Sequence, residues 1–138
     1  MSMTIIRATF MQALSTYAAA HNPVLTIARE GMAFTKPANN STFLEAFLVP
    51  ANTVLPTLAG SRRRFWGDFQ VNIWTKEGIG AGAGEAIAEE ISQLFPTVPK
   101  NYLPVSVEGP ANIRRSLTDT SGWRVTPLLI PYRMESEN

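Results

Sequence analysis

Apolar residues recur along the chain with two different periods, and each period predicts a type of element. Over residues 4–20 an apolar side chain returns every three or four positions, which predicts an amphipathic helix. Its apolar stripe consists of Ile6, Phe10, Leu14 and Tyr17. We expect the helix to end before Pro23, because proline cannot continue a helix. Residues 85–95 show the same period and predict a second helix, which follows a stretch rich in glycine.

Alternation with a period of two predicts strands, and it is clearest over residues 65–75. One face of this strand carries Phe69, Val71, Ile73 and Thr75, and the other carries Asp68, Gln70 and Asn72. Trp66 and Trp74 fall on the polar face, which indicates that this face is partly covered in the working protein. Further strands are expected over residues 24–29, 42–49, 105–108 and 123–132, with a brief extended piece at 32–34.

Prolines and polar stretches set the predicted ends of these elements. Pro50 is expected to end the strand before it. Pro127 and Pro131 place the last strand at or near a sheet edge, or at a bulge, because proline donates no ladder hydrogen bond. Three long connections are expected, at 50–64 with room for a helical turn around 53–58, at 96–104 and at 109–122. Loops of this length are usually functional or disordered until bound.

The order of the elements predicts the fold class. A helix, several strands, a second helix and further strands predict an α+β domain, in which both helices pack on one face of a mostly antiparallel β-sheet with long loops. The 138 residues are expected to form a single domain, residues 1–138, in which residues 134–138 make a polar tail.

Composition narrows the function classes. The chain has 12 Lys plus Arg against 11 Asp plus Glu, and its net charge of +1 argues against a basic DNA-binding protein. It has no cysteine, which excludes disulfides, thiolate metal sites and cysteine nucleophiles, and His21 is its single histidine. No segment approaches the roughly 18–20 apolar residues of a membrane span, so we expect a soluble chain without a membrane partner, made in a reducing compartment.

The glycine-rich stretch 78–84 raises the question of nucleotide binding. Gly78, Gly80 and Ala83 fit a loose dinucleotide fingerprint between a strand and a helix, where glycines let the backbone approach a pyrophosphate. The residues after Gly84 predict strands and no third helix, whereas a doubly wound fold needs several further strand and helix units. We therefore interpret the stretch as a linker whose small residues allow close packing. A small nucleotide-binding module remains the weaker alternative.

Other candidate chemistry is sparse. Glu85 and Glu89 share a helix face, as an acid and base pair or a metal-binding pair would, but solvated helix faces look the same. Arg62, Arg63 and Arg64 form the one concentrated charge, which suits contact with phosphates or an acidic partner as well as loop solubility. No nucleophile, base and oxyanion site come together in the pattern. We therefore expect an assembly protein, not an enzyme, without a cofactor or a metal.

The order of several segments resembles a known family. Residues 65–75, with the sequence FWGDFQVNIWT, lead through the glycine-rich turn to a helix that ends in Leu94-Phe95-Pro96. Around them lie a first helix, Asn22-Pro23-Val24 with a short strand, the segment 34–37, the strand 43–51 and the closing strand 123–132. Over nearly the whole chain this arrangement resembles the tail terminator (tail completion) family of long-tailed bacteriophages. Arg29-Glu30-Gly31 departs from it, since an aromatic, an acid and an asparagine are expected there.

The resemblance implies a virion structural protein at the neck end of the tail, assembled in the cytoplasm of the host bacterium. Such proteins form a ring, usually a hexamer, that caps the head-proximal end of the tail tube, stops its polymerisation and offers a docking surface to the head-side connector. The implied partners are further copies of the chain, the major tail tube protein and a head-completion or connector protein. DNA passes through the lumen without specific binding. Another neck protein, for head completion or as an adaptor, is the nearest alternative.

Five residues are the candidate contacts in such an assembly. We expect Trp66 and Trp74 at or near a subunit contact, because they are large apolar rings on a polar face. Arg62, Arg63 and Arg64 are expected to face the lumen or an adjoining ring. The resemblance transfers no role to a single position, so these expectations rest on burial and charge alone.

Overall fold

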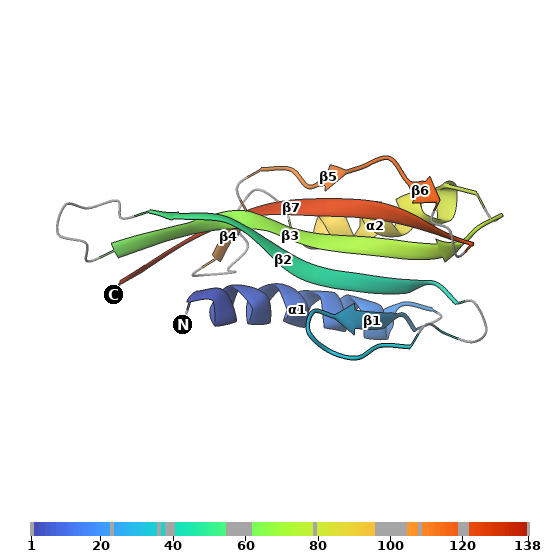
Figure 1. Ribbon diagram of the computed structural model, residues 1–138, viewed down its shortest axis with the longest axis horizontal. Coiled ribbons are helices and arrows are strands. Elements are labelled where there is room, and N and C mark those ends of the chain that lie inside the picture. The colour runs from blue at the N-terminus through green and yellow to red at the C-terminus, as the bar shows by residue number, and fades with distance from the viewer. Residues whose placement is uncertain are drawn as a thin grey trace.

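The computed structural model describes residues 2–22, 24–35, 37, 41–54, 62–78, 80–95, 105–107, 109–118 and 122–137 (Figure 1). Its elements are, in chain order, α1 (Ser2–Ala20), β1 (Thr26–Arg29), β2 (Phe43–Val54), β3 (Arg62–Lys76), α2 (Gly82–Leu94), β4 (Val105–Val107), β5 (Asn112–Ile113), β6 (Leu117–Thr118) and β7 (Trp123–Glu137). The fold is α+β, as the sequence predicts. The brief extended piece expected at 32–34 is not a strand.

The strands of the described residues form one seven-stranded sheet in the order β1-β2-β3-β7-β4, and the short β5 and β6 also pair with β7. Neighbouring strands are antiparallel, except that β1 runs parallel to β2. Along the far side of β7, β4 pairs with 132–134, β5 with 128–129 and β6 with 124–125. One margin of the sheet is therefore the edge of β1, and the opposite margin consists of three short strands in succession.

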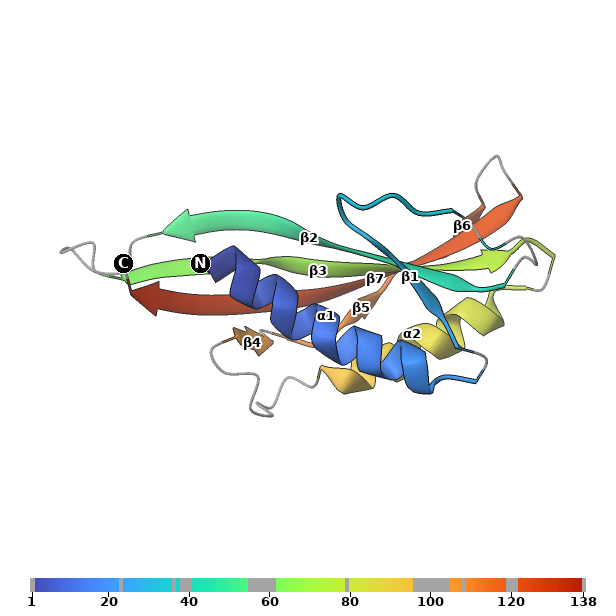
Figure 2. The ribbon, with the colours of Figure 1, turned by 90° about the horizontal axis from the view of Figure 1, so that it is seen from below.

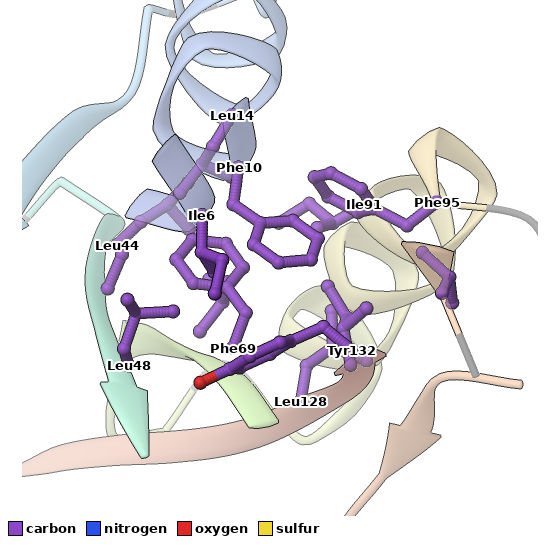
Figure 3. Packing of buried hydrophobic residues seen from close by; sticks show 14 of the residues in the cluster. Ile6, Phe10, Leu14, Leu44, Leu48, Phe69, Ile91, Phe95, Leu128 and Tyr132 are labelled. Carbon is purple, nitrogen blue, oxygen red and sulfur yellow. The ribbon is translucent and has the colours of Figure 1, made fainter. Parts of the chain in front are cut away.

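Both helices lie on the same face of the sheet, as predicted (Figure 2). From α1, the side chains of Ile6, Phe10 and Leu14 are buried against this face. The Phe10 ring stacks on Phe69 of β3 with 4.8 Å between the centroids, and it meets the edge of Phe95, directly after α2, at 5.2 Å (Figure 3). One aromatic side chain thus joins both helices to the sheet.

The strand β2 continues through Pro50 to Val54, contrary to the prediction that the proline ends it. Its pairing with β3 shifts register between Pro50 and Asn52, so an irregularity in the strand accommodates the residue that cannot donate. Gly67 pairs with Pro50, and a Cβ atom on Gly67 would lie 2.3 Å from the carbonyl oxygen of Val49. The two backbones therefore approach each other more closely than any side chain at this position allows.

The long connections differ from the prediction because their ends belong to strands. The connection expected at 50–64 is shortened from both sides by β2 and β3, so the arginines at 62–64 begin a strand instead of lying in a loop. The helical turn expected around 53–58 starts within β2, and the rest of it lies outside the described residues, as does the connection 96–104. The connection 109–122 contains β5 and β6.

The C-terminal strand extends further than the sequence pattern predicts. β7 runs to Glu137, where its last residues pair with the beginning of β3. The prediction of a polar tail at 134–138 is therefore wrong for residues 134–137. Met134 at the start of that segment is buried in the main core, which explains why the strand continues past Tyr132.

Pro127 and Pro131 lie in an interior strand, but their missing donors face its interrupted side. The carbonyl oxygen of Pro127 accepts a hydrogen bond of 2.8 Å from the backbone N–H of Arg114, beyond the end of β5. Because a strand residue directs its C=O and its N–H position to the same side, Pro127 lacks a donor only toward this margin. Pro131 is four positions away and faces the same side. The prediction that this strand lies near a sheet edge is therefore confirmed, because only the short strands β4, β5 and β6 lie between β7 and the margin.

Candidate functional site

The face of the sheet opposite the helices carries both predicted contact tryptophans. On β3 this face, called the open face below, consists of Trp66, Asp68, Gln70, Asn72 and Trp74. Trp66 and Trp74 are both half-buried there, while the alternating residues point into the main core. Eight positions of extended strand separate the two indoles by roughly 26 Å. The structure therefore places them at different ends of the open face and does not bring them together.

Trp74 belongs to an aromatic cluster. Its ring stacks on buried Phe43 of β2 with 5.9 Å between the centroids, and Phe43 also contacts Phe34 at 5.1 Å and Trp123 at 5.2 Å. Lys76 Nζ lies 5.3 Å from the Trp123 ring centroid, within cation–π range. The period of two in the sequence places Trp74 on this face. Its partners follow only from the register of the strands, which the sequence does not give.

A polar network adjoins the aromatic cluster. Glu45 Oε1 accepts hydrogen bonds from Asn72 Nδ2 at 2.9 Å and from Trp74 Nε1 at 3.3 Å. Gln70 Nε2 donates in turn to Asn72 Oδ1 at 2.9 Å. These bonds orient the indole and hold the Glu45 carboxylate by neutral donors. Of the polar residues that the sequence predicts on this face, Gln70 and Asn72 are thus bonded to each other.

A hollow of about 500 Å³ opens beside Trp74 and extends over β1 and the turn that follows it. We call it the β1 hollow, and its lining includes Glu30, Met32, Phe34, Phe43, Glu45 and Trp74. The side chains of Met32 and Phe34 are 66% and 37% exposed. Exposed apolar groups of this size, in a concave surface with a few polar groups, are typical of a contact site.

Glu30 connects this hollow to the rest of the fold. Its Oε1 accepts a hydrogen bond of 2.5 Å from Arg7 Nη1 in α1 and one of 3.3 Å from the backbone N–H of Leu48 in β2. The hydrogen bond from Arg7 is the main cause that lowers the pKa of Glu30 below its ordinary value of 4.5. The carboxylate therefore stays ionised at neutral pH.

The opposite margin of the sheet presents a different surface. We call it the β6 margin; it consists of Ile113, Arg114, Arg115 and Leu117. Ile113 and Leu117 are 37% and 59% exposed, and neither Arg114 nor Arg115 has an ion pair with any described residue. The sequence pattern does not reveal this surface, because residues 109–122 are predicted as a long connection. The signal that the sequence offers is two apolar residues, Ile113 and Leu117, on either side of two arginines within a predicted loop.

The helix pair Glu85 and Glu89 faces arginines. Both carboxylates line a hollow of about 580 Å³ together with Arg114, Arg115 and Arg124. A metal site would need further acidic or imidazole ligands, and no group of three or more such residues occurs in the described part of the chain. The arrangement favours a solvated charged surface over a catalytic pair.

The glycine-rich stretch serves a turn and a close packing contact. Gly78 and Gly80 have φ angles of +101° and +86°, which favour glycine. Gly84 is buried in α2, where a Cβ would lie 2.5 Å from Thr126 Oγ1 of β7. β3, which leads into the stretch, is antiparallel to both its neighbours, whereas the dinucleotide fingerprint belongs to a parallel unit. These observations favour the packing interpretation over nucleotide binding.

Arg62, Arg63 and Arg64 are the first residues of β3. Their backbones pair with Glu137, Ser136 and Glu135 of β7. Their side chains lie outside the described part of the structure, so the expectation that they face a lumen or an adjoining ring stays a prediction.

Comparison with known proteins agrees with the fold. The sequence model of the phage tail terminator protein family matches residues 5–132. The chain belongs to the phage tail terminator family. One solved structure shares 31% sequence identity with this tail terminator and has a TM-score of 0.79 to it. The match covers 100% of this chain and 99% of the chain in that structure. No curated protein matches the sequence.

This family membership makes the chain a virion tail component. Among the described residues, no helix of this tail terminator is long and apolar enough to cross a membrane.

Proposed function

We propose that the chain forms a ring that caps the head-proximal end of the phage tail tube, stops its polymerisation and presents a docking surface to the head-side connector. The family match over residues 5–132 is the observation that carries this proposal. It extends from the first turn of α1 into β7, so the assignment does not depend on a local motif.

A ring of identical subunits needs two unlike surfaces that meet head to tail and close after a whole number of copies. The two margins of the sheet are unlike, since one is a single strand edge and the other is assembled from short strands. Six copies are the number that the family resemblance implies. The tail tube protein and the connector would then bind the two faces of the ring.

The charge of the chain suits a passage for DNA. With a net charge of +1, the subunit has no general excess of cations to hold phosphates that must slide through the lumen. The proposed role is structural and needs no catalysis or cofactor. It places the protein at the neck end of the tail, assembled in the cytoplasm of the host.

Deletion of the gene from its phage, followed by electron microscopy of the tails, tests this proposal. We expect overlong tails without heads, and normal tails when the wild-type chain is supplied from a plasmid, because only the cap stops the tube from growing. Tails of normal length beside separate heads would instead identify a head-completion or adaptor protein and would overturn the capping role.

A further inference from the structure

We infer that the ring closes where Leu117, on the β6 margin of one subunit, inserts into the β1 hollow of the next subunit. This inference rests on the proposed ring and names the two surfaces that meet in it. Four features of the described residues support it: the positions of the two surfaces, their exposed apolar side chains, their charges and the fixed backbone that carries them.

The two surfaces lie at opposite margins of the sheet. Figure 1 shows β6 along the upper margin and β1 along the lower one, and β2, β3 and β7 separate them in the sheet order. A contact between unlike surfaces passes from subunit to subunit, whereas a surface that meets its own copy gives only a closed pair. Opposite positions are therefore what a ring requires.

Each surface exposes apolar side chains that a contact would remove from water. Leu117 is 59% exposed, and its backbone is held by pairing with Val125 of β7. In the β1 hollow, Met32 is 66% exposed and Phe34 is 37% exposed, beside the stacked ring of Trp74. Because the Leu117 backbone is already ordered by strand pairing, docking there orders side chains alone, at an entropic cost that burial of apolar surface can offset. A hollow of about 500 Å³ has room for a leucine side chain.

The charges of the two surfaces are complementary. Glu30 and Glu45 line the hollow. Glu30 is already paired with Arg7, whereas among the described residues Glu45 has only the neutral donors Asn72 and Trp74. Arg29 is the one cation among the described residues of the lining, and its guanidinium donates to Ser15 of α1 at 3.1 Å. On the β6 margin, Arg114 and Arg115 are exposed and have no ion pair with any described residue. Arg114 and Arg115 share their own hollow with Glu85 and Glu89. Docking would add the Glu45 carboxylate of the next subunit to the acidic groups near them, which favours this orientation over like-with-like pairing.

Engineered cysteines test the contact, because the natural chain has none that could interfere. Subunits carrying Met32→Cys are mixed with subunits carrying Leu117→Cys under mild oxidation, both in solution and in tails from complemented phage. We expect a disulfide-linked pair in at least one of the two preparations, formed about tenfold more than in the control, because a disulfide needs Cα atoms within ~7 Å. A chain with both substitutions should give a ladder that ends at the ring number.

The matched control replaces Met32→Cys by Ile5→Cys, since Ile5 is 38% exposed on α1 and lines neither surface. Equal cross-linking of the test and control pairs in both preparations would overturn the inference. Cross-linking of Met32→Cys to the tube protein or the connector would also overturn it and assign the hollow to that partner. Tail length in the complemented phage keeps the two proposals apart, because a wrong contact leaves the capping result unchanged.

A second pair of variants tests the head-to-tail orientation. Phe34→Asp damages the hollow and Leu117→Asp damages the margin, so each variant alone should fail to form rings. Mixed together, they retain one intact hollow and one intact margin and should form a one-to-one pair that cannot grow, as measured by light scattering. Rings formed by either variant alone, or a mixture without any pair, would contradict the orientation.

Discussion

Glu30 links the turn after β1 to α1 and β2. Its bonds to Arg7 and to the backbone of Leu48 favour the ionised carboxylate, and the Arg7 bond is the larger cause of its lowered pKa. A group whose pKa is lowered in the folded state contributes stability above its unfolded pKa. That contribution is lost as the pH falls through the folded value. Glu30 therefore stabilises the fold at neutral pH, and this stabilisation disappears below the ordinary value of 4.5.

We expect Glu30→Gln to lower the free energy of unfolding at about pH 7 by less than ~1 kcal/mol, because the ion pair is partly exposed to water. The difference from the wild type should shrink toward zero at a low pH that lies below the lowered folded pKa of Glu30, where the wild-type carboxyl is also neutral. Urea unfolding of both proteins at each pH measures this. Arg7→Gln removes the same bond from the other side and should show the same trend. An effect of constant size at both pH values would contradict the assignment.

Single-residue features were predictable from the sequence where they depend on alternation alone. The open-face position of Trp74 follows from the period of two over residues 65–75. Its stack on Phe43 and its bond to Glu45 depend on which residue of β2 lies opposite, and a shift of one position would exchange the faces. Turn chemistry and long-range packing set that register, so the β1 hollow could not be predicted from local patterns.

At the scale of elements, the pairing of β2 and β3 depends on a glycine at the irregular position. Gly67 → Ala would place a methyl group 2.3 Å from the Val49 carbonyl oxygen and 2.9 Å from the Ala51 nitrogen. Both atoms belong to the backbone, so relief requires the strands to separate. We expect a loss of about 2–3 kcal/mol in the free energy of unfolding, measured by urea titration.

Gly82→Ala is the matched control for this change. A Cβ at Gly82 meets no atom within 4 Å, and alanine is the better helix former. The control should leave stability unchanged or raise it by up to ~1 kcal/mol. Similar losses for both alanine variants would show that close backbone approach is not the cause.

The existence and type of both helices and of β1, β2, β3, β4 and β7 followed from the sequence, but most of their ends did not. Pro50 was a sound local reason to end a strand, yet the register shift lets β2 pair with β3 for several more residues. β5 and β6 have no pattern of their own, because two residues are too few to show a period. They are strands because they pair with backbone groups along the outer side of β7, and this pairing depends on the tertiary structure.

For the whole molecule, the family could be inferred from the order of soft patterns, because that order reflects the arrangement of both helices and the long strands. The surfaces that we propose for assembly could not be inferred from the sequence. The arginines at 62–64 drew attention by their charge, whereas the β6 margin, with fewer charges and two exposed apolar residues, is the surface that we propose as a subunit contact. The proposed head-to-tail contact uses matched surfaces at the two margins, and margins are a property of the folded sheet.

Variants of the two tryptophans compare the two ends of the open face as subunit contacts. Both were expected at a subunit contact, but they lie at different ends of the open face, and Trp74 alone lines the β1 hollow. We expect Trp74→Arg to reduce the mass of the assembled ring, because it removes the donor to Glu45 and places a cation where the neighbour's arginines would dock. Trp66→Arg makes the same chemical change outside the hollow and should leave the mass unaltered.

Light scattering of both variants measures the assembly, with unfolding curves to verify that each chain is folded. Trp74→Phe keeps an apolar ring in the stack and should retain the wild-type mass. If the free chain is monomeric, the tail lengths that each variant restores in the deletion phage give the same comparison. Loss of assembly with Trp66→Arg and not with Trp74→Arg would move the subunit contact to the other end of the open face, since one contact cannot span both indoles.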